Sequence, residues 1–370
     1  MTFEIIAEDG KARVGKLKTN HGTFETPFFM PVATKAVGKS FDGKDLEAMK
    51  TPSIICNSFV LSLAPGMERF KETKGIHQFM NFHKNIFTDS GGFQMYSNKF
   101  LIMTNEKGVK FKDPINGGEV FCSPEKSMQT QLTINSDVHM CLDDMPRLGA
   151  GHSRCVESIK KTAAWAKQCK TYHDQHKDGH LLFGICQGGL HEDLRKLSAE
   201  KITAIDFDGI ALGGLALGEG TQSMLKAIDV TLPFLPKEKP RYLMGIGVPT
   251  EIITTIGRGM DVWDSIYPTM NARHDHLFTM QGTLEINNKK YASDFSPIEE
   301  ECDCYTCKNF TRSYLHHLSR MKEAQSDRLN SLHNLRFMHR LTEQARTAIK
   351  EQRFAKFEKT FVHGYKKKVV

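Results

Sequence analysis

The stretch IFTDSGGFQ at residues 86–94 places a carboxylate, Asp89, at the end of an apolar run and then removes side-chain bulk. The glycine pair Gly91-Gly92 lets a ligand approach the backbone closely. Phe93, just beyond this pair, offers a flat apolar surface to a planar ring. The stretch therefore predicts a binding site for a flat molecule beside an acid.

Polar residues or bare backbone follow other apolar runs in the same way. Asp143 follows one run, Gln187 another, and the backbone around Gly214 and Leu215 a third. A carboxylate can accept hydrogen bonds from two adjacent N–H groups of guanine, while an amide and a backbone N–H can serve its carbonyl. Together these residues predict a pocket that reads the edge of a purine.

Asp264 is the second candidate acid, because it lies among the apolar residues of VWDSIY at 262–267. An ionised carboxylate in such surroundings is costly unless it is paired or has a functional role. Asp264 and Asp89 together form the pair of carboxylates that breaks a glycosidic bond through a covalent glycosyl intermediate. Beside a purine pocket, that pair suggests cleavage of a base–sugar bond within nucleic acid. The alternative for Asp264 is an acid bonded to neighbouring backbone at a strand end.

Three cysteines, Cys302, Cys304 and Cys307, lie within the six residues CDCYTC. Three thiolates with one histidine make a closed tetrahedral zinc site, which is structural rather than catalytic. We expect His333 as the fourth ligand, because it shares the apolar stripe of a helix predicted from residue 326 onward. His316, His317 and His339 are the other candidates, and a redox-active cysteine trio is the alternative to a metal site.

Short apolar runs alternate with helix-like segments up to about residue 295, which predicts a parallel sheet. The runs lie at 53–56, 86–88, 138–142, 181–186, 209–212, 242–244 and 262–266. At least seven such units favour a closed (β/α)8 TIM-type barrel over a doubly wound open sheet. In a barrel, the carboxyl ends of all strands meet at one mouth, which would bring the candidate residues together.

We expect two domains, a barrel over residues 1–295 and a small basic zinc-binding subdomain over 296–370. Residues 301–370 hold 15 Lys or Arg against 7 Asp or Glu, so the formal net charge of +7 comes from this end. A basic C-terminal region of this kind could bind a polyanion such as a nucleic acid. The alternative is that these basic residues only keep the exposed faces of helices in contact with water. No apolar run is long enough for a membrane helix, and nine scattered cysteines favour a reducing compartment, so we expect a cytoplasmic location.

Several motifs together resemble the tRNA-guanine transglycosylase (queuine tRNA-ribosyltransferase) family. They occur in the family's order over residues 10–360: TDSGGFQ at 88–94, QGG at 187–189 followed by LHEDLR, GGLALGE at 213–219, RYLMGIG at 241–247, WDSIYPT at 263–269, and CDCYTC with His333. The resemblance implies a zinc-containing barrel enzyme that exchanges the wobble guanine of U-G-U-type tRNAs for a 7-deazaguanine. The implied cofactor is one structural Zn²⁺ per subunit, and the implied partners are tRNA and a second copy of the chain.

The resemblance also implies a role for each matching residue. Asp264 would be the nucleophile and Asp89 the general acid/base. The implied base-binding residues are Ser90, Phe93, Asp143, Gln187, Gly214, Leu215 and Met244, with Phe93 and Met244 on the two faces of the ring. Arg273 would contact tRNA, whereas Met270 replaces an arginine that many members carry.

Other functions stay open at this stage, as does the identity of the incoming base. Leu217 adds bulk that favours the smaller aminomethyl precursor over queuine, while LDD at 142–144 looks more like the queuine users. A non-catalytic tRNA-binding partner subunit would have lost one of the two acids. A zinc-dependent barrel hydrolase would need histidine or carboxylate ligands at the barrel mouth.

Overall fold

The computed structural model describes residues 2–91, 101–113 and 116–365 of the 370-residue chain. Within these residues, eight parallel strands form one sheet in the order β4-β14-β13-β12-β11-β10-β6-β5. Their bounds are β4 (Phe28–Pro31), β5 (Ser53–Asn57), β6 (Asn85–Asp89), β10 (Val138–Met140), β11 (Leu181–Cys186), β12 (Gly209–Leu212), β13 (Arg241–Leu243) and β14 (Val262–Ser265). A bridge between Val32 and Ile55 links the two outer strands, so the sheet closes into a barrel.

All seven apolar runs of the sequence are barrel strands, which confirms the barrel prediction. Strands such as β11 are buried along their whole length, as expected for a parallel sheet covered on both faces. The eighth strand, β4, escaped prediction because it directly follows Pro27 and ends in Pro31. Proline removes a backbone donor and normally argues against a central strand.

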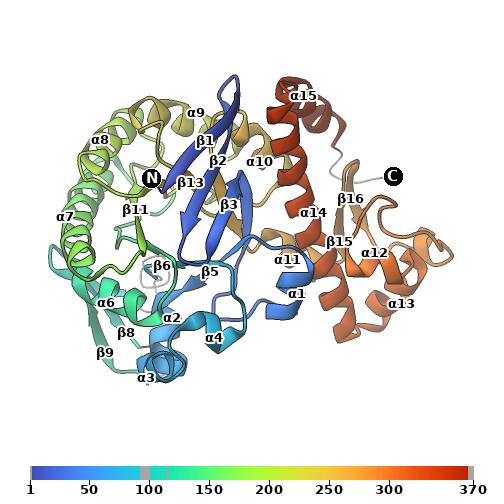
Figure 1. Cartoon of the computed structure of the whole chain (residues 1–370), viewed down its shortest axis with the longest axis horizontal. Helices are drawn as coiled ribbons and strands as arrows, with labels where there is room; N and C mark the ends of the chain where they lie inside the picture. Colours follow the sequence, from blue (N-terminus) through green and yellow to red (C-terminus); the bar gives the residue numbers. More distant parts are fainter. Residues whose placement is uncertain (1, 92–100, 114–115, 366–370) are drawn as a thin grey trace.

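Helices surround the barrel (Figure 1). They are α1 (Gly43–Ala48), α2 (Ser58–Leu61), α3 (Met67–Glu72), α4 (Ile76–Met80), α6 (Pro124–Ile134), α7 (His152–His176), α8 (Glu192–Thr203), α9 (Thr221–Thr231), α10 (Pro249–Ile256), α11 (Tyr267–Ala272) and α14 (Ala324–Lys350). Each links or follows barrel strands except α14, which packs against β4 and α11 from the far end of the chain. In the described part of the chain, no helix is both long enough and apolar enough to cross a membrane.

A three-stranded antiparallel sheet covers the end of the barrel opposite the candidate residues (Figure 1). Its strands are β1 (Phe3–Asp9), β2 (Ala12–Thr19) and β3 (Gly22–Thr26). Arg13 of β2 donates to both carboxylate oxygens of Asp261, which directly precedes β14, at 3.0 and 2.5 Å. His21, at the β2–β3 turn, bonds Asp137 ahead of β10 at 2.7 Å. The sheet is therefore tied to the amino ends of the barrel strands.

A second packed cluster lies beside the barrel at the carboxyl end of the chain. The elements involved are the hairpin β15 (His276–Thr279) and β16 (Gly282–Glu285), and the helices α12 (Tyr305–Asn309) and α13 (Arg312–Met321). Its buried residues include Leu277, Ile298, Leu315 and Leu329. The remaining elements are the sheet β7 (Leu101–Asn105), β8 (Gly108–Lys112) and β9 (Glu119–Cys122), and the terminal helix α15 (Phe354–Gly364). The division at residue 295 stays a prediction.

Many basic residues of the C-terminal region form ion pairs with acids from earlier in the chain. The pairs are Arg312–Asp294, Arg328–Asp45, Arg340–Glu299, Arg346–Glu25 and Lys350–Glu25. Much of the charge asymmetry in the sequence therefore reflects contacts within the protein. Exposed side chains in the same region are Lys308, Arg320, Lys322, Lys356 and Lys359, while the run at 366–368 lies outside the described residues.

The Arg13–Asp261 pair is buried on both sides, so its loss should be costly. We expect Arg13→Ala to lower the free energy of unfolding by about 3–5 kcal/mol, because it leaves Asp261 buried without its cation. Urea unfolding followed by circular dichroism measures this change. Lys44→Ala, which removes an exposed pair with Glu47, serves as the control and should cost less than about 1 kcal/mol. Equal effects of the two substitutions would contradict the prediction.

Candidate active site and metal centre

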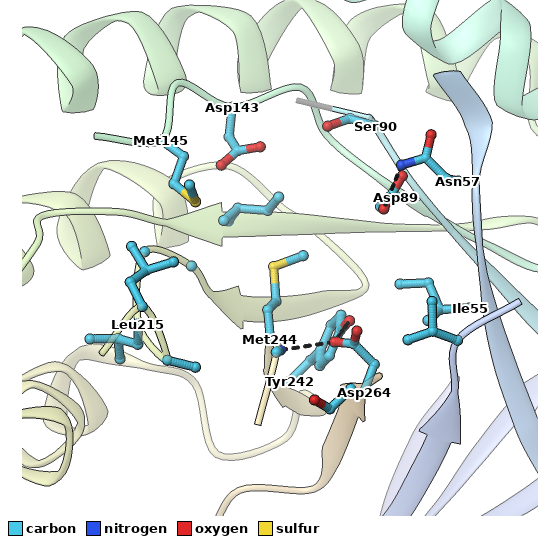
Figure 2. Close-up of a pocket in the computed structure, with 18 of the residues that line it drawn as sticks. Ile55, Asn57, Asp89, Ser90, Asp143, Met145, Leu215, Tyr242, Met244 and Asp264 are labelled. Carbon is cyan, nitrogen blue, oxygen red and sulfur yellow. Dashed lines mark hydrogen bonds between the residues drawn. The ribbon is translucent and has the colours of Figure 1, made fainter. Parts of the chain in front are cut away.

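A cavity of about 520 Å³ opens at the carboxyl ends of the barrel strands. Figure 2 shows acidic, amide and apolar side chains converging on it from different strands. Eight of the residues predicted from the sequence line it: Asp89, Ser90, Asp143, Gln187, Gly214, Leu215, Met244 and Asp264. Phe93 lies outside the described residues. The convergence follows from barrel closure, because parallel strands all end at the same rim.

Asp264 lies on β14, in the wall of the cavity, and its carboxylate is held by two donors. The Tyr242 hydroxyl donates to Oδ1 at 2.5 Å, and the Gly245 backbone N–H donates to the same oxygen at 3.0 Å. Burial raises the pKa of Asp264, and these two hydrogen bonds oppose the rise by stabilising the ionised form. The structure therefore holds one carboxylate oxygen and leaves Oδ2 as the oxygen that can meet a ligand.

Asp89 ends β6 and faces the same cavity. Its Oδ1 accepts from the Gly91 N–H at 3.0 Å, and its Oδ2 accepts from the Asn57 side-chain amide at 3.1 Å. Burial raises the pKa of Asp89 to about 7; the Gly91 hydrogen bond opposes this rise, and the negative charge of Asp264 adds to it. A carboxyl group with such a pKa can both donate and accept a proton near neutral pH.

Asp143 and Gln187 form a hydrogen-bonded pair in the cavity wall. The Gln187 amide nitrogen donates to Asp143 Oδ2 at 2.6 Å. Burial raises the pKa of Asp143 to about 7, and the Gln187 hydrogen bond opposes that rise. The buried Gln187 Oε1 has no hydrogen-bond partner in the structure. Because a buried polar atom without a partner is costly, this oxygen fits a donor on a bound ligand.

Sequence reasoning missed two residues that shape the acid pair. Tyr242 was assigned only to a strand, yet its hydroxyl contacts Asp264. The second is Asn57, whose side-chain amide contacts Asp89; its own Oδ1 accepts from the Val60 N–H and thereby fixes the side chain. Tyr242 could have been found from strand periodicity, because alternate residues of a barrel strand point inward.

Arg273, predicted to contact tRNA, is not among the cavity-lining residues. It follows α11, where its Nε donates to the Thr269 carbonyl at 3.2 Å, and its side chain is partly exposed. Two apolar side chains near it, Ile266 and Met270, are 54% and 37% exposed.

The predicted metal ligands form one cluster. The Sγ atoms of Cys302, Cys304 and Cys307 lie 3.8, 3.6 and 3.3 Å from His333 Nδ1. Zinc–sulfur bonds of about 2.3 Å and zinc–nitrogen bonds of about 2.0 Å in a tetrahedron separate sulfur and nitrogen by similar distances. The four side chains therefore fit a single zinc-sized ion.

His333 is the histidine that lies in the cysteine cluster. Its Nε2 bonds the Phe278 carbonyl at 2.7 Å, which leaves Nδ1 as the unprotonated nitrogen facing the thiols. His316 instead bonds the Ile286 carbonyl, and His339 bonds the Thr51 hydroxyl. In the described residues, one other group could hold a metal by proximity, His21, His77 and Asp137. Its two imidazoles stack face to face at 3.5 Å, so they do not point at one common centre.

Comparison with known proteins identifies the family. The sequence model of the family described as queuine tRNA-ribosyltransferase matches residues 8–367. The queuine tRNA-ribosyltransferase of Francisella tularensis subsp. novicida (strain U112) is 45% identical over 366 residues, which cover 99% of each chain. That of Acinetobacter baylyi (strain ATCC 33305 / BD413 / ADP1) is 44% identical over 362 residues, 98% of this chain and 94% of the relative. Since these matches span nearly the whole chain, this protein belongs to the queuine tRNA-ribosyltransferase family of enzymes.

Proposed function

We propose that this protein is a tRNA-guanine transglycosylase that exchanges the wobble guanine of tRNAs with a U-G-U anticodon sequence for a 7-deazaguanine, as a step of queuosine biosynthesis. The observation that carries the proposal is the presence of two buried acids, Asp89 and Asp264, in one cavity beside the Asp143–Gln187 pair. The family relationship supports the same reaction class.

In the proposed mechanism, Asp264 Oδ2 attacks C1′ of the ribose as the C1′–N9 bond to guanine breaks. Asp89, in its acid form, donates a proton to the departing guanine, which leaves as a neutral base. The ribose stays bonded to Asp264. The incoming base then attacks C1′ through its own N9, Asp89 takes the N9 proton, and the Asp264 carboxylate is released. Two displacements at one carbon retain its configuration.

The proposed base contacts use the groups that line the cavity. Asp143 would accept from N1–H and the 2-amino group. The second hydrogen of Gln187 Nε2 and the backbone N–H groups at Gly214 and Leu215 would serve the O6 side. Met244 would cover one face of the ring, Phe93 the other, and Ser90 would line the same pocket. The elevated pKa of Asp143 supports this assignment, because a bound base with two adjacent donors would stabilise its ionised form.

The incoming base is proposed to be the smaller aminomethyl 7-deazaguanine rather than queuine. Leu217 lines the cavity together with Leu215 and Met145, so the wall in this region is built of bulky side chains. A competition assay in which both bases displace labelled guanine from tRNA distinguishes the two candidates. Stronger competition by queuine would overturn this choice.

We further propose that the Cys302, Cys304, Cys307 and His333 cluster binds one structural Zn²⁺ and that the protein is a cytoplasmic homodimer, with Arg273 contributing to tRNA binding. Four protein ligands leave no open coordination position on the metal. A group of three aromatic rings lies beside the cluster: Phe310 stacks on Tyr314 and meets Tyr305 edge to face. Both tyrosines are exposed, which supports a dimer contact there. All nine cysteines are free thiols, which supports a reducing compartment.

Asp264→Asn should abolish the exchange, because an amide is a poor nucleophile. We expect incorporation of labelled guanine into tRNA to fall by about 10⁴-fold or more. Wild-type protein incubated with tRNA and no free base should give a protein–tRNA adduct that survives denaturing electrophoresis, and this substitution should remove it. Asp229→Asn, on the exposed side of α9, serves as the control and should retain the adduct. An adduct that persists without Asp264 would rule out this residue as the nucleophile.

The rate should depend on pH through both acids. Asp89 must be protonated to assist guanine departure, so kcat/KM for tRNA should fall about tenfold per pH unit above about 7, where Asp89 loses its proton. At low pH, kcat/KM should fall as Asp264 becomes protonated, because this residue must be ionised to attack. The midpoint of this fall should lie above the usual aspartate range, because the pKa of Asp264 is raised. A pH series of initial rates from 4 to 9 tests both limbs. A flat profile above pH 7 would remove Asp89 from the proton-transfer role.

Native mass spectrometry of the purified protein should give two chains and two zinc ions per particle. Cys304→Ser should lower the zinc content to less than half and lower the melting temperature, because a structural metal contributes folding free energy. Cys155→Ser, which changes a cysteine far from the cluster, should leave the zinc content unchanged. A monomeric mass would refute the dimer alone, and a metal-free wild-type protein would refute the zinc site.

A further inference from the structure

Arg195 is a fully buried arginine beneath the cavity, on α8. Among the described residues, no carboxylate forms an ion pair with it. Its guanidinium instead donates to the carbonyls of Gly189 at 2.7 Å, Gly213 at 3.0 Å, Cys186 at 3.3 Å and Gly214 at 3.5 Å. Burial lowers its pKa to about 10, so the side chain stays charged at neutral pH. A buried cation held only by carbonyl dipoles is costly and calls for an explanation.

The four carbonyls come from the two turns that carry the base-reading groups. Cys186 and Gly189 flank Gln187 at the end of β11, while Gly213 and Gly214 follow β12. Gly189 and Gly214 adopt left-handed backbone conformations with φ of +57° and +67°. A Cβ on Gly214 would lie 2.5 Å from Gln187 Oε1. The glycines of the QGG and GGL sequences thus allow both turns to close around one guanidinium.

Peptide geometry fixes what this arrangement does to the backbone donors. In a trans peptide, the C=O of one residue and the N–H of the next point in opposite directions. The carbonyls of Gly213 and Gly214 point to Arg195, so the N–H groups of Gly214 and Leu215 point away from it. Gly214 and Leu215 line the cavity. Two consecutive backbone donors are therefore held in one orientation at the cavity wall.

Helix α8 also holds the other reading group in this wall. The Ser198 hydroxyl, one turn after Arg195, accepts from the Gln187 backbone N–H at 2.9 Å. Gln187 is thus fixed through its backbone by Ser198, while the carbonyls on either side of it are fixed by Arg195. The side chain of Gln187 then reaches Asp143. One helix face therefore sets the positions of both turns relative to Asp143.

We propose that Arg195 is a positioning residue for recognition of the 6-oxo group of the base: by binding the carbonyls of both turns, it orients the Gly214 and Leu215 N–H groups and Gln187 toward that oxygen. This proposal rests on the proposed function and adds a residue that touches neither base nor tRNA. It predicts an effect on selectivity at one edge of the base. A residue needed only for folding would have no such effect.

The test compares Arg195→Met and Arg195→Lys with wild type, using guanine, 6-thioguanine and hypoxanthine as competing bases in the tRNA exchange assay. 6-Thioguanine replaces the 6-oxygen by a weaker acceptor, and hypoxanthine lacks only the 2-amino group that faces Asp143. We expect Arg195→Met to reduce the KM ratio of 6-thioguanine to guanine by about three- to tenfold, the value of one ordinary hydrogen bond. The ratio for hypoxanthine should stay unchanged. Arg195→Lys should lie in between, because one ammonium cannot span four carbonyls.

Arg241→Met is the matched control. Arg241 is also buried, with a pKa lowered to about 10 by burial, and it also donates to carbonyls, those of Gly259, Leu235 and Pro236. It starts β13 at the opposite end of the barrel, so its loss should lower the melting temperature without changing either ratio. Unchanged ratios in both Arg195 variants, or equal changes in Arg241→Met, would overturn the proposal. A wild-type protein that fails to exchange guanine would instead refute the proposed function.

Discussion

Closure of the parallel sheet is the constraint on which the whole site depends. The barrel closes where the chain after β4 meets β5, through the Val32–Ile55 bridge and the hydrogen bond from Ala33 N–H to the Ile55 carbonyl. An open sheet would leave β14 and β6 far apart, because they stand near opposite ends of the strand order. Once β4 and β5 join, Asp264 and Asp89 face each other across one cavity. The chemistry of the pair is therefore a product of topology, since no local sequence feature brings the two acids together.

The electrostatics of the cavity are set by three buried carboxyl groups whose hydrogen bonds only partly offset the effect of burial on their pKa values. The pKa values of Asp89, Asp143 and Asp264 are all raised by burial, and each carboxylate receives its own neutral donors rather than a cation. Neutral donors lower a pKa less than an adjacent arginine does, so the pKa values of Asp89 and Asp143 stay at about 7 and that of Asp264 stays raised. Arg195, a buried cation nearby, is held by carbonyls. Arginine bound in this way organises backbone without neutralising the acids.

The barrel, the presence of acids at strand ends and the cysteine cluster could be predicted from the sequence, because each depends on residue type and local order. Seven strands follow from apolar runs, and three cysteines in six residues leave few interpretations. Other features depend on contacts between distant segments and have no local signal. The strand β4 follows Pro27 and ends in Pro31, so its pattern does not indicate a central strand. The three-stranded cover depends on Arg13 meeting a residue 248 positions away. Tyr242 and Arg195 look like ordinary strand and helix residues until the fold places them beside Asp264 and the two turns.

The distribution of charge along the chain has a consequence for how the C-terminal region could be reused. Arg328, Arg340 and Arg346 meet Asp45, Glu299 and Glu25, which come from sites scattered along the chain. Arg340 thus pairs within the C-terminal region itself, while Arg328 and Arg346 join this region to acids in the first 50 residues of the chain. A chimaera that grafts this region onto the barrel of a distant relative must carry the matching acids with it, or Arg328 and Arg346 lose their ion-pair partners.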